Sequence, residues 1–243
     1  MNTRIGRAVG LLAIVILLIS ACGIGTIRGS GNMVTEPRDV SGFDRVSLSG
    51  TGEVVITQGD EESLTVETDD NIMPYVITEV SGGTLHLALD AERARSISPT
   101  RLRFTVAVRD LAGLEVSGSG SATSTGIDTE RLDVEVSGSG DVRIDSLTAE
   151  AVGVQISGSG DVELRGEVTG QDININGSGE YIAGDLRSQT ARVAVSGSGD
   201  ATVWVTESLD ANVNGSGSVN YYGTPQTRVS GDDSEDINRL GDK

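Results

Sequence analysis

The chain has 243 residues, of which 36 are acidic and 18 are basic, so its formal net charge at pH 7 is −18. This acidity argues against partners that are themselves polyanions, which excludes nucleic acids and disfavours anionic lipid surfaces. Aromatic residues make up only 3% of the sequence while glycine contributes 33 residues, which argues against a helical bundle and against an enzyme with a large aromatic core.

The first predicted element is an export signal, residues 1–21. An apolar run, residues 11–19, follows two arginines and is too short to cross a bilayer as a permanent helix. The sequence Ser20-Ala21-Cys22 follows and resembles a bacterial lipobox, which implies cleavage before Cys22 and lipidation of its thiol. Residues 22–33 would then be a Gly-rich tether, and the membrane would be a partner through Cys22.

The predicted location is therefore the cell envelope, outside the cytoplasm. Gly23 after the cysteine is compatible with the outer membrane if the bacterium has two membranes. The alternative is a secreted protein that keeps a cysteine near its cleavage site. Cys22 is the only cysteine of the chain, so no disulfide is expected.

Residues 34–241 are predicted to form one domain, which begins irregularly. A Gly-rich mark occurs early, at Ser49-Gly50-Thr51-Gly52, and returns only at Ser117, so the chain between must form larger coils or an inserted hairpin. Residues 75–89 alternate as two strands around Ser81-Gly82-Gly83. Residues 101–108 alternate again, with the apolar members facing inward.

The second half repeats a Ser/Asn-Gly-Ser-Gly mark six times, about every 20 residues, over residues 112–223. The copies start at Ser117, Ser137, Ser157, Asn176, Ser196 and Asn214. Apolar and polar residues alternate on both sides of each mark, so each copy is predicted to be strand, Gly-rich turn, strand. If each copy is one coil of a parallel β-solenoid, equivalent residues stack about 4.8 Å apart and the apolar columns form a continuous core. An antiparallel meander or barrel is the alternative, because hairpins can use the same turn.

Four columns of residues are predicted to face the interior. Two precede the mark, and these contain Leu114, Val116 and their equivalents in the later copies; two follow it, and these contain Ala122, Ser124 and their equivalents. Pro225 interrupts the pattern, and residues 224–241 are predicted to form a charged C-terminal cap that prevents end-to-end stacking.

The early Ser-Gly-Thr-Gly unit, the serial Val-Ser-Gly-Ser-Gly-Asp units and the closing Ile237-Asn238-Arg239-Leu240-Gly241 resemble the putative auto-transporter adhesin family, head GIN domain, a domain of unknown function in bacterial envelope lipoproteins. The resemblance covers about residues 34–241. It implies a right-handed parallel β-helix at the cell surface, and it brings no catalytic residues. The acidic stretch at residues 232–236 departs from a plain closing turn.

An acidic residue follows the mark in four successive copies: Asp141, Asp161, Glu180 and Asp200. Like charges about 4.8 Å apart repel by roughly 1 kcal/mol per pair in a water-like dielectric. The row is therefore either a calcium site or a solvated row in which the carboxylates cap local backbone. Calcium is the one cofactor that the sequence leaves open.

Two further surfaces are candidates for binding. An outward column of Asp145, Arg165, Gly184, Trp204 and Tyr222 places the only tryptophan beside a tyrosine, and such a pair suits a sugar ring or a protein partner unless the C-terminal segment covers it. Five arginines gather in one stretch, and two of them are predicted to share a solvent face where an anionic glycan or lipid phosphate could dock, or where they simply offset the acid excess. They are Arg93, Arg95, Arg101, Arg103 and Arg109, and the pair is Arg101 and Arg103.

Catalysis has little support in the sequence. His86 is the only histidine, and it lies on a strand pattern between Leu85 and Leu87, so it is interpreted as structural. The prediction is a non-enzymatic, lipid-anchored envelope protein, an adhesin or surface-display module whose partners are envelope glycans or proteins. Two alternatives stay open: a carbohydrate-active β-helix enzyme of the lyase or hydrolase type, and a calcium-dependent structural module. The oligomeric state is not predicted.

Overall fold

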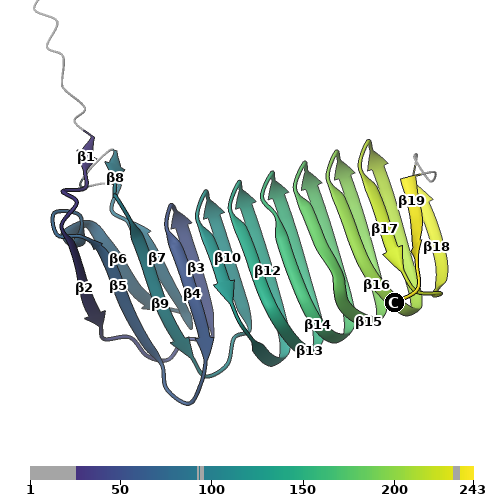
Figure 1. Ribbon diagram of the computed structural model, residues 1–243, viewed down its shortest axis with the longest axis horizontal. Coiled ribbons are helices and arrows are strands. Elements are labelled where there is room, and N and C mark those ends of the chain that lie inside the picture. The colour runs from purple at the N-terminus through teal and green to yellow at the C-terminus, as the bar shows by residue number, and fades with distance from the viewer. Residues whose placement is uncertain (1–25, 92, 94–95, 232–235) are drawn as a thin grey trace, which may run out of the picture.

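The computed structural model describes residues 26–91, 93, 96–231 and 236–243, and these form an elongated β-solenoid (Figure 1). The predicted signal peptide and Cys22 lie outside the described residues. Within the described ranges, none of the helical segments is long and apolar enough to pass through a bilayer. The short helix η1 (Met73–Tyr75) lies near the N-terminal end.

The regular part of the solenoid is a stack of parallel coils. Its strands are β10 (Gly113–Gly118), β11 (Ser121–Ser124), β12 (Ile127–Gly138), β13 (Asp141–Gly158), β14 (Val162–Gly177), β15 (Glu180–Gly197), β16 (Asp200–Gly215) and β17 (Ser218–Tyr222). The Gly-rich marks lie in register, so Ser137 pairs with Ser117 on one side and with Ser157 on the other. The prediction of an all-β solenoid with coils of about 20 residues is confirmed, and the antiparallel meander is wrong for these coils.

The core is the set of inward columns that the sequence predicts. Along β12 the alternation places Leu132, Val134 and Val136 inside with at most 2% exposure, while Glu135 between them is exposed. Each coil stacks its apolar residues on those of the coil before, and burying one such side chain stabilises the fold by about 1.5–3 kcal/mol. Tyr221, the last member of the column that contains Ser124, is only half-buried, and its neighbour in the next coil is the polar Arg239.

The two glycines of each mark are needed for different reasons. Gly138 has φ +120°, and a Cβ there would lie 2.5 Å from the carbonyl oxygen of Gly118 in the preceding coil. That oxygen accepts a hydrogen bond from the Ser139 N–H (2.8 Å), so the corners stack through their backbones. At Gly140, a Cβ would lie 2.6 Å from the Gly120 oxygen. The first glycine therefore supplies an unusual φ and close approach, and the second supplies close approach.

The N-terminal part is an extra layer rather than an interruption between coils. Its strands are β1 (Ile27–Arg28), β2 (Met33–Arg38), β3 (Arg45–Gly50), β4 (Glu53–Gln58), β5 (Ser63–Asp69), β6 (Val76–Ser81), β7 (Thr84–Leu89), β8 (Ile97–Ser98) and β9 (Leu102–Val108). Ser49 pairs directly with Ser117, so β3 and β4 form the coil beneath β10 and β11. On the far side, β7 and β9 pair with them in parallel.

Antiparallel strands complete this end. β6 and β7 form the predicted hairpin, and β2, β5 and β9 form a second antiparallel set. The inward face predicted for residues 101–108 is confirmed, because Leu102, Phe104, Val106 and Val108 are buried. Part of the segment predicted as a tether is ordered in the fold, since β1 pairs in parallel with β8.

A last coil ends the stack. It consists of β18 (Gln226–Gly231), which pairs with β16, and β19 (Ile237–Gly241), which pairs with β17. Val229 stands in an inward column above Ala211 but is 41% exposed, because no further coil of the described residues covers it. The acidic residues 232–235 of the predicted cap lie outside the described residues.

Candidate functional site

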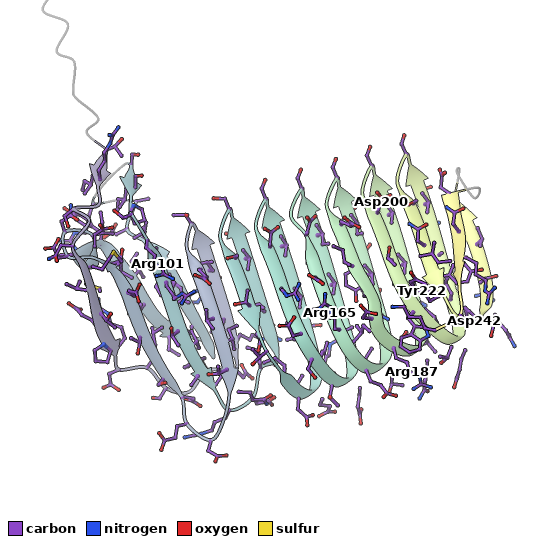
Figure 2. All side chains as sticks on the ribbon, viewed as in Figure 1. Arg101, Arg165, Arg187, Asp200, Tyr222 and Asp242 are labelled. Carbon is purple, nitrogen blue, oxygen red and sulfur yellow. The ribbon has the colours of Figure 1, made fainter. Side chains whose placement is uncertain are left out.

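The acidic row follows one corner of the solenoid and is engaged with backbone. The Asp161 N–H donates to Asp141 Oδ1 (3.2 Å), and the Glu180 N–H donates to Asp161 Oδ1 (3.0 Å). At the end of the row, both the N–H and the hydroxyl of Ser218 donate to Asp200 Oδ1 (2.8 and 2.7 Å). Figure 2 shows Asp200 at this corner. Three of the four carboxylates thus cap the coil that follows them.

Charge accumulates along this row. Partial desolvation of its largely exposed side chain, together with the neighbouring carboxylates of Asp161 and Asp200, raises the pKa of Glu180. Among the described residues, no group of three His, Cys, Asp or Glu side chains is arranged to hold a metal ion. Calcium binding to the row stays a prediction, and the capping bonds give the carboxylates a structural role that does not require a cation.

The aromatic pair lies where the sequence places it, and a lysine covers it. Trp204 and Tyr222 are cross-strand neighbours, and both are half-buried. The Lys243 ammonium lies 4.6 Å from the centre of the Tyr222 ring and 6.0 Å from that of Trp204. It also forms an ion pair with Asp185 and lowers the pKa of that carboxyl. A sugar ring that stacked here would have to displace the lysine.

The predicted outward column around this pair is only partly correct. Asp145 and Arg165 do meet, in an ion pair of 3.8 Å. However, Arg165 pairs in register with Asp185 rather than with Gly184, and Trp204 pairs with Arg187. The register shifts there because β-bulges add residues to one strand of each pair, which a constant count from the mark cannot detect.

The two arginines predicted to bind anions are already paired. Arg103 forms a two-pronged hydrogen bond with Glu53 (Nε–Oε2 2.9 Å, Nη2–Oε1 2.8 Å), and Arg101 lies 3.2 Å from Glu67. Hydrogen bonding to Arg103 lowers the pKa of Glu53 despite partial burial. The guanidinium groups of Arg101 and Arg103 are therefore neutralised by carboxylates of the protein, which leaves less positive charge to attract an external anion.

The remaining arginines of that stretch do not join them. Arg93 lies over the ring of Tyr75 (5.6 Å), and Arg109 donates to the carbonyl oxygen of Asp60 (2.9 Å). Arg95 lies outside the described residues. Proximity in sequence thus does not produce one basic patch, because the loops carry these side chains to different edges.

A surface that sequence reasoning missed is a shallow groove on the outer face of the sheet that holds β3, β10 and β12. It consists of two hollows of about 370 and 530 Å³ that share Asp172. Along it runs one outward row, which we call the charged row, paired coil by coil. Its members are Arg45, Gly113, Asp133, Gly153, Asp172, Arg192, Asp210 and Arg228.

Two glycines deepen this groove at its N-terminal end. The Arg45 side chain lies across Gly113, whose Cβ would be 2.6 Å from Nη1, and approaches Asp133 (3.9 Å). From the other side, Arg131 contacts the same carboxylate (2.7 Å) beside Gly153. One aspartate therefore lies between two guanidinium groups, in a hollow that a side chain at either glycine would fill.

The neighbouring outward row carries polar groups without partners. Glu135, Gln155 and Asn174 pair in register, are exposed, and make no side-chain hydrogen bond within the described part of the chain. The signal that could have revealed the groove is a glycine at an outward strand position. Gly113 and Gly153 stand where other copies carry charged side chains, and glycine inside a strand often marks close approach of another group.

The fold and these surfaces define a class of protein: a β-solenoid with an apolar interior and polar, exposed outward rows. The chain belongs to the family described as putative auto-transporter adhesin, head GIN domain, which it matches over residues 42–225. The family prediction from the sequence is confirmed.

Solved structures share the fold. One, described as a putative adhesin from Bacteroides fragilis, is 28% identical with a TM-score of 0.80, over 89% of this chain and 100% of that one. Another, described as a putative lipid binding protein from Parabacteroides distasonis, is 27% identical with a TM-score of 0.76, with the same coverage. A putative adhesin from Parabacteroides merdae, 19% identical with a TM-score of 0.69 over 88% of this chain and 99% of that one, shows the fold alone. No curated protein matches the chain.

Proposed function

We propose that this protein is a non-enzymatic binding module of the bacterial cell envelope, held to the membrane by a lipid on Cys22. The observation that carries the proposal is the arrangement of its side chains. Apolar columns fill the interior of every regular coil, so partners meet only the outward rows. Membership of an adhesin-like family supports the proposed binding function.

The N-terminal end of the solenoid is suited to the anchored position. Asp69 accepts hydrogen bonds from the N–H groups of Gly31 and Thr100 (both 2.7 Å), and Asp70 accepts one from Asn32 (2.8 Å). These bonds hold Gly31 and Asn32, just before β2, against the N-terminal end of the solenoid (Figure 1). A lipid on Cys22 would therefore keep this end near the membrane and leave the outer faces accessible.

The contacts around the only histidine argue against a Ser-His-acid catalytic triad. His86 is exposed and pairs in register with Ser47. The Ser47 hydroxyl donates to Glu115 Oε2 (3.0 Å), so the serine lies between the histidine and the carboxylate. In a nucleophilic triad the histidine must lie between the other two groups.

The proposal is tested with the full chain expressed in a bacterium, beside the Cys22→Ala variant. The wild-type chain should fractionate with membranes, carry a lipid-modified N-terminal cysteine by mass spectrometry, and increase retention of intact cells on surfaces coated with isolated envelope material. Cys22→Ala should lose the first two properties and the retention. A wild-type chain that is released without lipid, or cells whose retention is unchanged by the protein, would contradict the proposal.

A further inference from the structure

The groove on the outer face has a charge balance unlike that of the whole protein. The charged row contains three arginines and three aspartates, whereas the chain as a whole carries a formal charge of −18. Opposite charges alternate in its C-terminal half, where Arg228 lies 4.0 Å from Asp210. A polyanion or a polycation would gain no net attraction along such a row.

We propose that this groove binds a neutral linear polysaccharide that lies along the long axis of the solenoid. The inference rests on the binding function proposed above and names its ligand class. A neutral sugar chain presents hydroxyl groups that both donate and accept hydrogen bonds. It is therefore matched by alternating guanidinium and carboxylate groups, together with the unpaired amides of Gln155 and Asn174.

The repeat of the groove also fits a sugar polymer. Successive coils offer equivalent outward positions about 4.8 Å apart, so seven intervals from Arg45 to Arg228 span about 34 Å. One pyranose residue of an extended chain has about the length of one such interval. Each sugar can thus meet one coil, and affinity should increase with chain length until the groove is filled.

The groove is deepest at the hollow that Gly113 and Gly153 line, because these residues have no side chains. At Gly113 and Gly153 the strands carry no side chain, and the flexible ends of Arg45 and Arg131 occupy the space above them, so a sugar ring that displaces these ends can approach the sheet more closely than at the other coils. The aromatic pair does not offer this, because Lys243 lies over it. The acidic row does not either, because three of its four carboxylates cap backbone.

The test is calorimetric titration of the protein with cello-, xylo- and β-1,3-gluco-oligosaccharides of graded length, with hyaluronan as a polyanion. The decisive variant is Gly153→Thr. Its Cβ would meet Asp133 Oδ1 and the end of the Arg131 side chain, so these groups can move while the threonine fills the hollow. The matched control is Gly126→Thr at the turn after β11, where the nearest atom to a Cβ is 3.7 Å away. A second variant, Gln155→Ala with Asn174→Ala, removes the amides without adding volume.

At least one neutral series should bind more tightly as its chains lengthen. Gly153→Thr and the amide double variant should each weaken that binding by about tenfold or more, because the threonine fills the hollow and the double variant removes amide hydrogen bonds to the sugar. Gly126→Thr and Trp204→Ala should leave it within about twofold, and circular dichroism checks that every variant is folded. If neutral chains fail to bind while envelope retention persists, the groove proposal is wrong and the proposed function stands. Binding of hyaluronan alone, binding lost in Trp204→Ala but kept in Gly153→Thr, or affinity independent of length would each overturn it as well.

Discussion

The stacked Gly corners make a quantitative prediction for one substitution, Gly158→Ala. Gly158 has φ +139°, and its Cβ would lie 2.2 Å from the Gly138 carbonyl oxygen. The strained backbone costs about 1–3 kcal/mol, and overlap in a packed site costs about 1–3 kcal/mol more. We therefore expect Gly158→Ala to lower the free energy of unfolding by about 2–6 kcal/mol.

The assay is urea unfolding followed by far-ultraviolet circular dichroism, with the shift in midpoint as the readout because long repeat arrays can depart from two-state behaviour. Gly160→Ala separates the two causes, since its Cβ would lie 2.0 Å from the Gly140 oxygen at a φ outside the left-handed region. Gly126→Ala is the control, and its midpoint should shift little. A Gly158→Ala midpoint that matches the Gly126→Ala midpoint would refute the reasoning.

Three other predictions concern side chains. Tyr181→Phe should lower the free energy of unfolding by about 1–3 kcal/mol, because the buried Tyr181 hydroxyl donates to Gln171 Oε1 (2.8 Å) and its loss leaves that oxygen unpaired; chemical denaturation measures it. Lys243→Ala should uncover Trp204, which predicts a red-shifted emission and stronger acrylamide quenching; an unchanged spectrum would argue against the lysine cover. The pKa of Glu180 is raised in the folded chain, so its charge destabilises the fold above that pKa and protonation relieves this as the pH falls. Glu180→Gln should therefore stabilise the fold at neutral pH by a few tenths of a kcal/mol, since the site is exposed, and should have no effect at about pH 3; equal melting shifts at both pH values would contradict this.

The regular coils could be predicted from sequence because each local signal repeats. Val116, Val136 and Ile156 alternate with polar residues at a constant distance from a glycine corner, and stacking makes that pattern a buried column. The adjacency of Trp204 and Tyr222 follows from the same count, since no bulge separates them. Because equivalent residues of successive copies stack on one another, the repeat predicts which residues are neighbours in the fold.

The remainder depends on contacts that no local pattern encodes. Ser49 stacks directly on Ser117, but the sequence cannot show that β5 to β9 fold onto the far side of the first coil rather than between the two. The bulge after Ala183 shifts the register by an amount that only packing decides. The groove could not be predicted from the repeat pattern, because it depends on the missing side chains of Gly113 and Gly153 and on which neighbouring side chains lie over them.

Every surface described above depends on consecutive Gly-rich corners lying one above another. The most direct measurement is electron paramagnetic resonance of the distance between two spin labels on introduced cysteines, in a Cys22→Ala background. One cysteine replaces Ser119, and the second replaces Ser178, Ser198 or Ser216. These exposed corner residues are three, four and five coils away, so the backbone separation should be about 14, 19 and 24 Å. Distances that increase by about 4.8 Å per coil would support the account, and distances that do not increase with the number of coils would contradict it.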